Sequence, residues 1–125
     1  MTGVQTCALP ICSTHTDTVY QQVSIPSTAT AATLVFWRHI DTVETTTTTT
    51  VYDSLKLQIR NSSGTVLATL ATYSNLDAAP GYAQVSFDLT AYNGQTIQIY
   101  FVGVEDASLK TSFVLDDFAL NVTTP

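Results

Sequence analysis

Hydrophobic and polar residues alternate along short stretches of this chain, which is the pattern of β-strands that bury one face. The clearest example covers residues 95–103, where Ile97, Ile99 and Phe101 keep strict period two and therefore share one face. We expect this strand to pair with the last patterned stretch of the chain, residues 111–122.

That last stretch carries the same pattern with one interruption. Phe113 and Leu115 lie on one side of the predicted strand. The apolar positions then resume three residues on instead of two, at Phe118, Leu120 and Val122. A strand keeps its apolar face across such a slip only if it carries one extra residue, which is a β-bulge. The pattern places this bulge on Asp116 and Asp117 and predicts that the apolar residues on both sides of it point into one interior.

Five other stretches read as strands: 18–25, 33–41, 51–59, 65–70 and 82–89. Turn-forming residues at 61–64 and 91–94 separate strands, and residues 71–81 are expected to form a loop. No stretch shows the apolar period of 3.6 that a helix requires. Seven short strands without helices predict an all-β fold, an antiparallel β-sandwich of about seven to eight strands.

One charged residue breaks the alternation of the strand at 33–41. Leu34, Phe36 and Ile40 share one parity, and Arg38 shares it with them. Either Arg38 lies at a margin of the sheet or the register shifts there.

Composition narrows the class of protein. A chain of 125 residues is one domain, and 45% hydrophobic with 11% charged residues fits a β-rich extracellular protein. A run of six threonines at 45–50 is expected to form a solvated strand end or a wide loop at the sandwich rim. The net charge of −6 leaves no basic stripe for phosphates, so nucleic acid is not an expected partner. No apolar run is long enough for a membrane span.

Residues 1–12 differ from the rest, and we interpret them as a non-native leader before a single domain at 13–125. They contain both cysteines, Cys7 and Cys12, and no charge. They lack the basic start of a signal peptide, and Pro10 interrupts their apolar run. Residues 4–11 resemble the translated sequencing-adapter text that contaminates metagenomic gene models. The two cysteines then indicate neither a metal site nor a compartment; a Cys-x4-Cys disulfide is the alternative.

The chain from Thr14 to Val122 resembles a family of jelly-roll modules that are appended to secreted bacterial hydrolases and surface proteins. These modules are similar to MAM domains and to calcium-containing carbohydrate-binding modules. The matching pieces are residues 15–18, 34–42, 52–55, 61–67, 87–96, 103–106 and 113–117. The resemblance implies a jelly-roll sandwich. It also implies a segment before residue 15 that the leader replaces here, so that an N-terminal edge strand is lacking and a sheet edge is exposed.

The resemblance also implies a structural calcium ion. Calcium takes six to eight oxygen ligands, typically carboxylates and carbonyls from converging loops. The expected metal ligands are Asp17, Glu105, Asp106, Asp116 and Asp117, which we expect to meet at one edge of the sandwich. The alternative is that these acids accept the backbone N–H groups that bulges and turns leave unpaired.

Sugars stack on exposed flat rings, so the aromatic residues are the second group of interest. Trp37 and His39 have the parity opposite to Phe36 and are expected to face outward. The predicted ligand-binding residues are Trp37 and His39 together with Tyr100, another aromatic residue available for stacking. The alternative is that Trp37 packs beneath a loop.

Catalysis is not expected. His15 and His39 lie in neither a nucleophile elbow nor a zinc-binding HExxH pattern, and the five glycines form no phosphate-binding loop. With catalysis not expected, the resemblance implies a non-catalytic accessory module of a secreted or cell-surface bacterial protein. Such a module attaches its host to polysaccharide or protein, or packs against neighbouring domains of the host. The alternative is a structural spacer or adhesin repeat without a small ligand.

Overall fold

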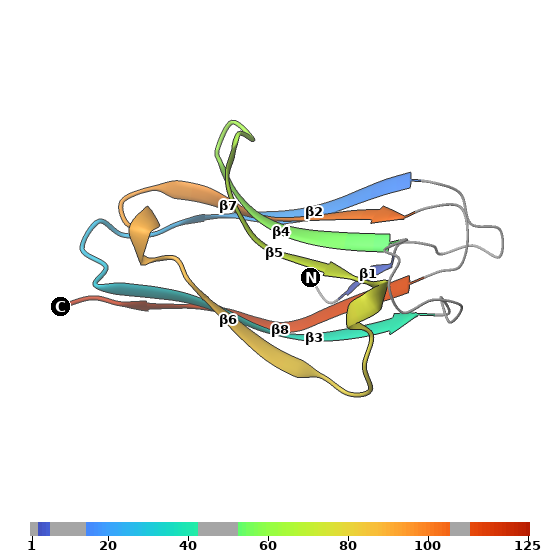
Figure 1. Cartoon of the computed structure of the whole chain (residues 1–125). Coiled ribbons are helices and arrows are strands. Elements are labelled where there is room, and N and C mark those ends of the chain that lie inside the picture. Colours follow the sequence, from blue (N-terminus) through green and yellow to red (C-terminus); the bar gives the residue numbers. More distant parts are fainter. Residues whose placement is uncertain (1–2, 6–14, 43–52, 106–110) are drawn as a thin grey trace.

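The computed structural model describes residues 3–5, 15–42, 53–105 and 111–125. Their strands form two four-stranded antiparallel sheets packed face to face (Figure 1). Sheet A has the order β1 (Gly3–Gln5), β8 (Thr111–Thr123), β3 (Ala31–Thr42) and β6 (Ala83–Asp88). Sheet B has the order β2 (His15–Ser24), β7 (Thr96–Glu105), β4 (Asp53–Asn61) and β5 (Val66–Ser74). Two 3₁₀ turns, η1 (Asn75–Asp77) and η2 (Thr90–Tyr92), precede and follow β6. The predicted all-β sandwich is confirmed.

The core lies between the sheets and is built from the period-two faces of their strands. Its buried apolar members include Leu34, Phe36, Ile40, Leu55, Leu57, Ile59, Leu89, Ile97, Ile99, Phe101, Phe113 and Leu115. Phe36 is fully buried at its centre. The Phe36 ring stacks on Phe118 at 5.0 Å between centroids and on Phe87 at 6.1 Å, and it meets Phe101 edge to face at 5.7 Å.

The predicted β-bulge is present in β8. Val35 pairs with Ala119, but Trp37 pairs with Asp116. The one residue between them on β3, Phe36, therefore faces two residues of β8, Asp117 and Phe118. Asp117 is the only described residue other than glycine with a positive φ, at 55°. Aspartate tolerates this conformation better than most side chains do. The Asp116 carboxylate accepts the backbone N–H of Asp117 at 2.9 Å. This is the hydrogen bond expected if these acids satisfy backbone groups at the bulge and do not bind calcium.

The bulge keeps most of the apolar face of β8 turned toward the interior. Phe113 and Leu115 are buried before it, and Phe118 and Leu120 pack against the core after it. Val122, near the end of the strand, is 38% exposed and does not belong to the core.

The predicted pairing of the last two strands is wrong. Residues Thr96–Glu105 form β7 in sheet B between β2 and β4, whereas β8 pairs with β1 and β3 in sheet A. The two apolar faces meet across the core instead of lying side by side in one sheet. Both arrangements bury the same alternate residues, so periodicity does not distinguish them.

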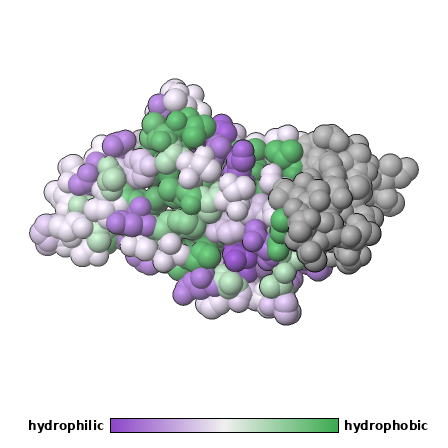
Figure 2. Space-filling model, in the orientation of Figure 1, coloured by the Kyte–Doolittle hydropathy of each residue, from purple (hydrophilic) through white to green (hydrophobic). Residues whose placement is uncertain are grey.

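The predicted turn at 61–64 is confirmed as the β4–β5 hairpin. Gly64 has a φ of 90°, and the Asn61 side chain accepts the backbone N–H groups of Ser63 and Thr65. Val66 and Leu67 follow this turn and are exposed, and Figure 2 shows hydrophobic surface just below the hairpin tip.

The predicted loop at 71–81 is wrong for its first residues. β5 runs to Ser74 because Tyr73 and Ser74 are buried at its end. A capping box then starts η1: the Ser74 hydroxyl accepts the N–H of Leu76, and the Asp77 carboxylate accepts the N–H of Ser74. Irregular chain follows only after Asp77.

Three residues of the predicted leader, Gly3–Gln5, form β1 and pair with Ser112–Val114 of β8. The assignment of residues 1–12 as a non-native leader stays a prediction. Cys7, Cys12, Asp106 and the threonine run at 45–50 lie outside the described residues. Among the described residues, no helix is long and apolar enough to cross a membrane.

Candidate functional site

The outward face of sheet A carries an aromatic residue between two polar neighbours. Trp37 of β3 lies beside Gln84 of β6 on one side and Asp116 of β8 on the other. Residues that pair directly in an antiparallel sheet project from the same face. Trp37 is 37% exposed, as its parity predicts, so its ring is available to solvent beside an amide and a carboxylate.

A second aromatic residue lies at the end of the same face. The rings of His39 and Tyr82 are 5.4 Å apart between centroids, and Tyr82 is 55% exposed. The His39 Nδ1 lies 2.7 Å from the carbonyl oxygen of Gly81, so Nδ1–H donates to it and orients the imidazole. We call Trp37, His39, Tyr82, Gln84 and Asp116 the Trp37 face.

Trp37 and His39 lie on an outward face, as their parity predicts, whereas Tyr82 and Gln84 were not among the predicted ligand-binding residues. The sequence does indicate that both residues face outward, because Tyr82 and Gln84 have the parity opposite to Val85 and Phe87, which pack against the core. Only the pairing of β6 with β3 shows that this parity lies beside Trp37.

Arg38 lies behind the Trp37 face, at the margin of the sandwich. Its guanidinium carbon is 4.9 Å from the centroid of the Tyr73 ring in sheet B, so the side chain reaches between the sheets. Burial raises the pKa of the Tyr73 hydroxyl, and the positive charge of Arg38 opposes that rise. A cavity of about 90 Å³ opens here, and Arg38, His39, Asp77 and Tyr82 are among its lining residues. The register of β3 against β8 shifts just before Arg38, but the extra residue belongs to β8. Arg38 therefore keeps the inward parity of Phe36 and Ile40, and its position at the margin, the first of the two alternatives, accommodates its charge.

Tyr100 lies on the opposite side of the molecule from Trp37. It projects from the outer face of sheet B, where its ring stacks on Tyr20 with centroids 5.0 Å apart and planes 9° from parallel. Arg60 of β4 covers the other side of this ring, with its guanidinium carbon 3.8 Å from the centroid. Gln58 fixes Arg60 by accepting from its Nε and Nη2 at 3.1 and 2.7 Å. Both faces of Tyr100 are therefore occupied, and one ligand ring does not contact both Trp37 and Tyr100.

The predicted calcium ligands are divided between the sheets. Asp17 is exposed on β2 of sheet B, whereas Asp116 and Asp117 are on β8 of sheet A. The side chains of Glu105 and Asp106 lie outside the described part of the chain. Within the described part, no three His, Cys, Asp or Glu residues come together as a metal-binding group. These residues alone do not fit a calcium ion, and the calcium site stays a prediction.

The calcium hypothesis has a direct thermal test. It predicts a higher Tm in calcium than in chelator, because an ion that binds only the folded state stabilises it. The Asp116→Ala and Asp117→Ala variants are each expected to lose that difference, and Asp88→Ala on β6 serves as the control that keeps it. Equal Tm values for the unaltered protein in calcium and in chelator, measured by differential scanning calorimetry, contradict the hypothesis.

Comparison with solved structures finds a similar fold in a carbohydrate-binding module. The chain is similar to the solved structure of TmCBM61 in complex with β-1,4-galactotriose, with a TM-score of 0.59 and 14% sequence identity. The likeness covers 90% of this chain and 67% of that one. No protein-family model and no curated protein sequence matches the chain. At this identity, the likeness shows a common sandwich fold.

Proposed function

We propose that this domain is a non-catalytic carbohydrate-binding module and that the Trp37 face is its sugar-binding surface. The observation that carries the proposal is the pair of exposed aromatic side chains, Trp37 and Tyr82, on one outward face of sheet A. The C–H face of a pyranose ring packs on such rings, and neighbouring hydrogen-bonding groups fix its orientation.

The spacing of the Trp37 face suits an extended oligosaccharide. Tyr82 lies beside His39, and His39 is two residues from Trp37 along β3. Neighbouring strands are about 4.8 Å apart and two residues span about 6.7 Å, so the two aromatic positions are about 8 Å apart. Different sugar rings of one chain can therefore contact the two side chains.

The charges of the domain favour a neutral polysaccharide. Asp116 provides a carboxylate beside Trp37, and the whole chain has a net charge of −6. Carboxylate and amide oxygens accept hydrogen bonds from sugar hydroxyls, but a negative surface repels uronates and sulfated sugars. The fold likeness to a structure solved with β-1,4-galactotriose makes β-1,4-galactan the first probe.

We further propose that the domain is an accessory part of a larger secreted or cell-surface bacterial protein, for which it holds polysaccharide near the host. The resemblance of residues 14–122 to jelly-roll modules of secreted bacterial hydrolases and surface proteins supports this. A non-catalytic role is supported by the fold likeness to a binding module. Fold alone does not specify function, so binding decides between this role and that of a structural spacer.

Replacement of Trp37 by alanine is expected to weaken binding to soluble β-1,4-galactan at least about tenfold, because 1.4 kcal/mol of lost stacking and burial corresponds to that factor. Affinity gel electrophoresis with the polysaccharide cast into the gel measures the effect. Tyr20→Ala is the matched control, since Tyr20 is 53% exposed on the outer face of sheet B. Binding that survives Trp37→Ala and is lost in Tyr20→Ala moves the site to sheet B. No retardation on galactan or on a panel of neutral plant and microbial polysaccharides favours the spacer.

A further inference from the structure

The edge of β8 that faces away from β3 has no strand partner along most of its length in the described part of the molecule. β3 pairs with β8 along Thr111–Thr123, but on the other edge β1 reaches only Ser112–Val114. From Leu115 to Thr123, that second edge has no strand partner among the described residues. Its outward N–H and C=O groups form a template for another strand.

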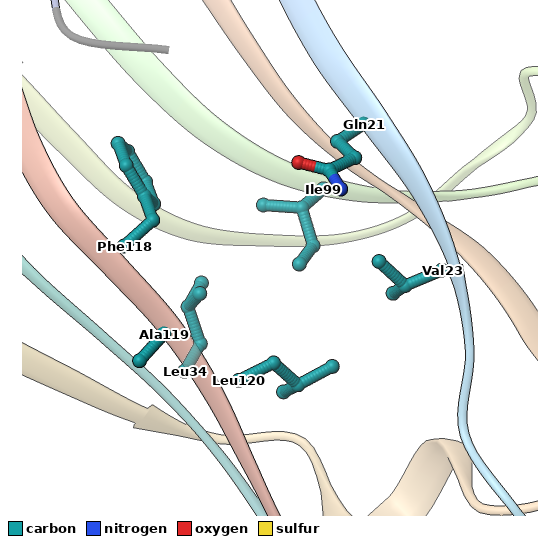
Figure 3. A pocket seen from close by; sticks show the side chains of 7 residues that line it. All are labelled: Gln21, Val23, Leu34, Ile99, Phe118, Ala119 and Leu120. Atoms are coloured by element: carbon teal, nitrogen blue, oxygen red, sulfur yellow. The ribbon is translucent and has the colours of Figure 1, made fainter.

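An apolar groove runs beside this edge. β2 is the edge strand of sheet B on the same side, and a cavity of about 150 Å³ opens between β2 and β8 (Figure 3). The residues lining it are Gln21, Val23, Leu34, Ile99, Phe118, Ala119 and Leu120. Phe118 and Leu120 pack against the core and are only partly buried, so solvent reaches side chains that belong to the interior.

Beyond the bulge, the exposed edge carries no charged residue and no proline that would oppose pairing with another strand. Natural edge strands are interrupted by lysine, proline or inward-pointing charges. Residues 118–123 contain no charged residue and no proline, although the chain has a net charge of −6. The bulge at Asp117 lies before this segment, and residues 119–123 pair regularly with β3.

We propose that this edge joins two copies of the chain, β8 against β8 in antiparallel orientation about a two-fold axis near Leu120. In that register, Leu120 pairs with Leu120 of the second copy, and Phe118 pairs with Val122 of the second copy. These pairs are apolar, and the register opposes no two like charges between residues 118 and 122, so the segment is self-complementary. Sheet A then continues across both molecules, and the second copy covers the groove and Val122.

The paired segment 118–122 is distinct from the Trp37 face, whose one member on β8, Asp116, lies before the bulge. The edge lies at the side of sheet A, whereas Trp37 projects from its outer surface. Association of two acidic chains is opposed by their charge, so higher salt strengthens the dimer.

Sedimentation velocity of the full chain tests the proposal. At about 100 µM protein the chain is expected to sediment as a dimer and to dissociate on dilution, by mass action. Val122→Lys places a charge in the interface and is expected to sediment as a monomer at the same concentration. Val104→Lys is the control: Val104 is 39% exposed, close to the 38% of Val122, but lies on β7 with a strand on either side. It is expected to remain dimeric.

Hydrogen exchange then locates the contact. Amides of residues 118–123 are expected to exchange more slowly at high protein concentration, while those of β5 do not change. A monomer at all concentrations, open-ended polymers, a dimer that survives Val122→Lys, or a dimer without protection of β8 overturns the proposal. Val122→Lys is expected to bind galactan as the unaltered protein does, whether or not the dimer forms. Galactan binding therefore tests the Trp37 face separately from the proposed interface.

Discussion

A chain from which Asp117 has been deleted is expected to lose much of its stability. Asp117 is the extra residue of the bulge, and its loss advances every later position of β8 by one. Since strand side chains alternate, Phe118 and Leu120 then point away from the core. Phe118 loses its contacts with the rings of Phe36 and Phe101, at 5.0 and 5.8 Å. Exposing the two side chains costs about 1.5–3 kcal/mol each before cavities are counted. A typical domain has a stability of only about 5–15 kcal/mol.

Far-UV circular dichroism and urea denaturation measure the effect of the deletion. Asp117→Gly is the control, because it keeps the residue count and accepts a φ of 55° without strain. We expect its stability to lie within about 1 kcal/mol of the unaltered protein. If the deletion variant keeps the original urea midpoint, β8 tolerates an uninterrupted ladder. The claim that the bulge is needed to turn Phe118 and Leu120 toward the core is then wrong.

Phe36→Ala is expected to lower the free energy of unfolding by about 3–5 kcal/mol. The Phe36 side chain is fully buried and contacts the rings of Phe87, Phe101 and Phe118. These rings come from strands of both sheets, so the resulting cavity loosens the contact between them.

Phe87→Ala is the matched control for this change. Phe87 is only partly buried, and 6.1 Å separates its ring centroid from that of Phe36. We expect it to lose about half as much stability, on the order of 2 kcal/mol. Equal urea midpoints for the two variants contradict Phe36 as the centre of the core.

The bulge shows what a sequence can reveal about a sandwich. A strand that buries one face has to keep its apolar residues on that face, so a slip from two residues to three requires an insertion at Asp116 and Asp117. This inference needs only the strand itself, and the register of β8 against β3 confirms it.

Relations between strands were predicted less well, for a physical reason. The apolar faces of β7 and β8 give the same pattern whether the strands pair within one sheet or face each other across the core. In the fold they face each other, because the chain crosses from sheet B to sheet A between them. The same limit applies to the aromatic residues. Parity places Trp37 and Tyr100 on outward faces, but only topology shows that these faces are on opposite sides.

Residues at the ends of strands were predicted least well. Tyr82 precedes β6, and its place beside His39 depends on the path of the chain through Gly81. Tyr73 and Ser74 were expected in a loop, but their burial extends β5 by local packing that a short sequence window does not encode.

The chain contains a single tryptophan, and it lies on the outer surface of sheet A. Selectively excited indole emission therefore comes from one location, with no second fluorophore of that kind to dilute it. The intensity and wavelength of that emission report on the water around Trp37, without a dye or label. The opposite surface, with its stacked tyrosines, contributes nothing to this signal, so the domain has a built-in optical reporter for one side only.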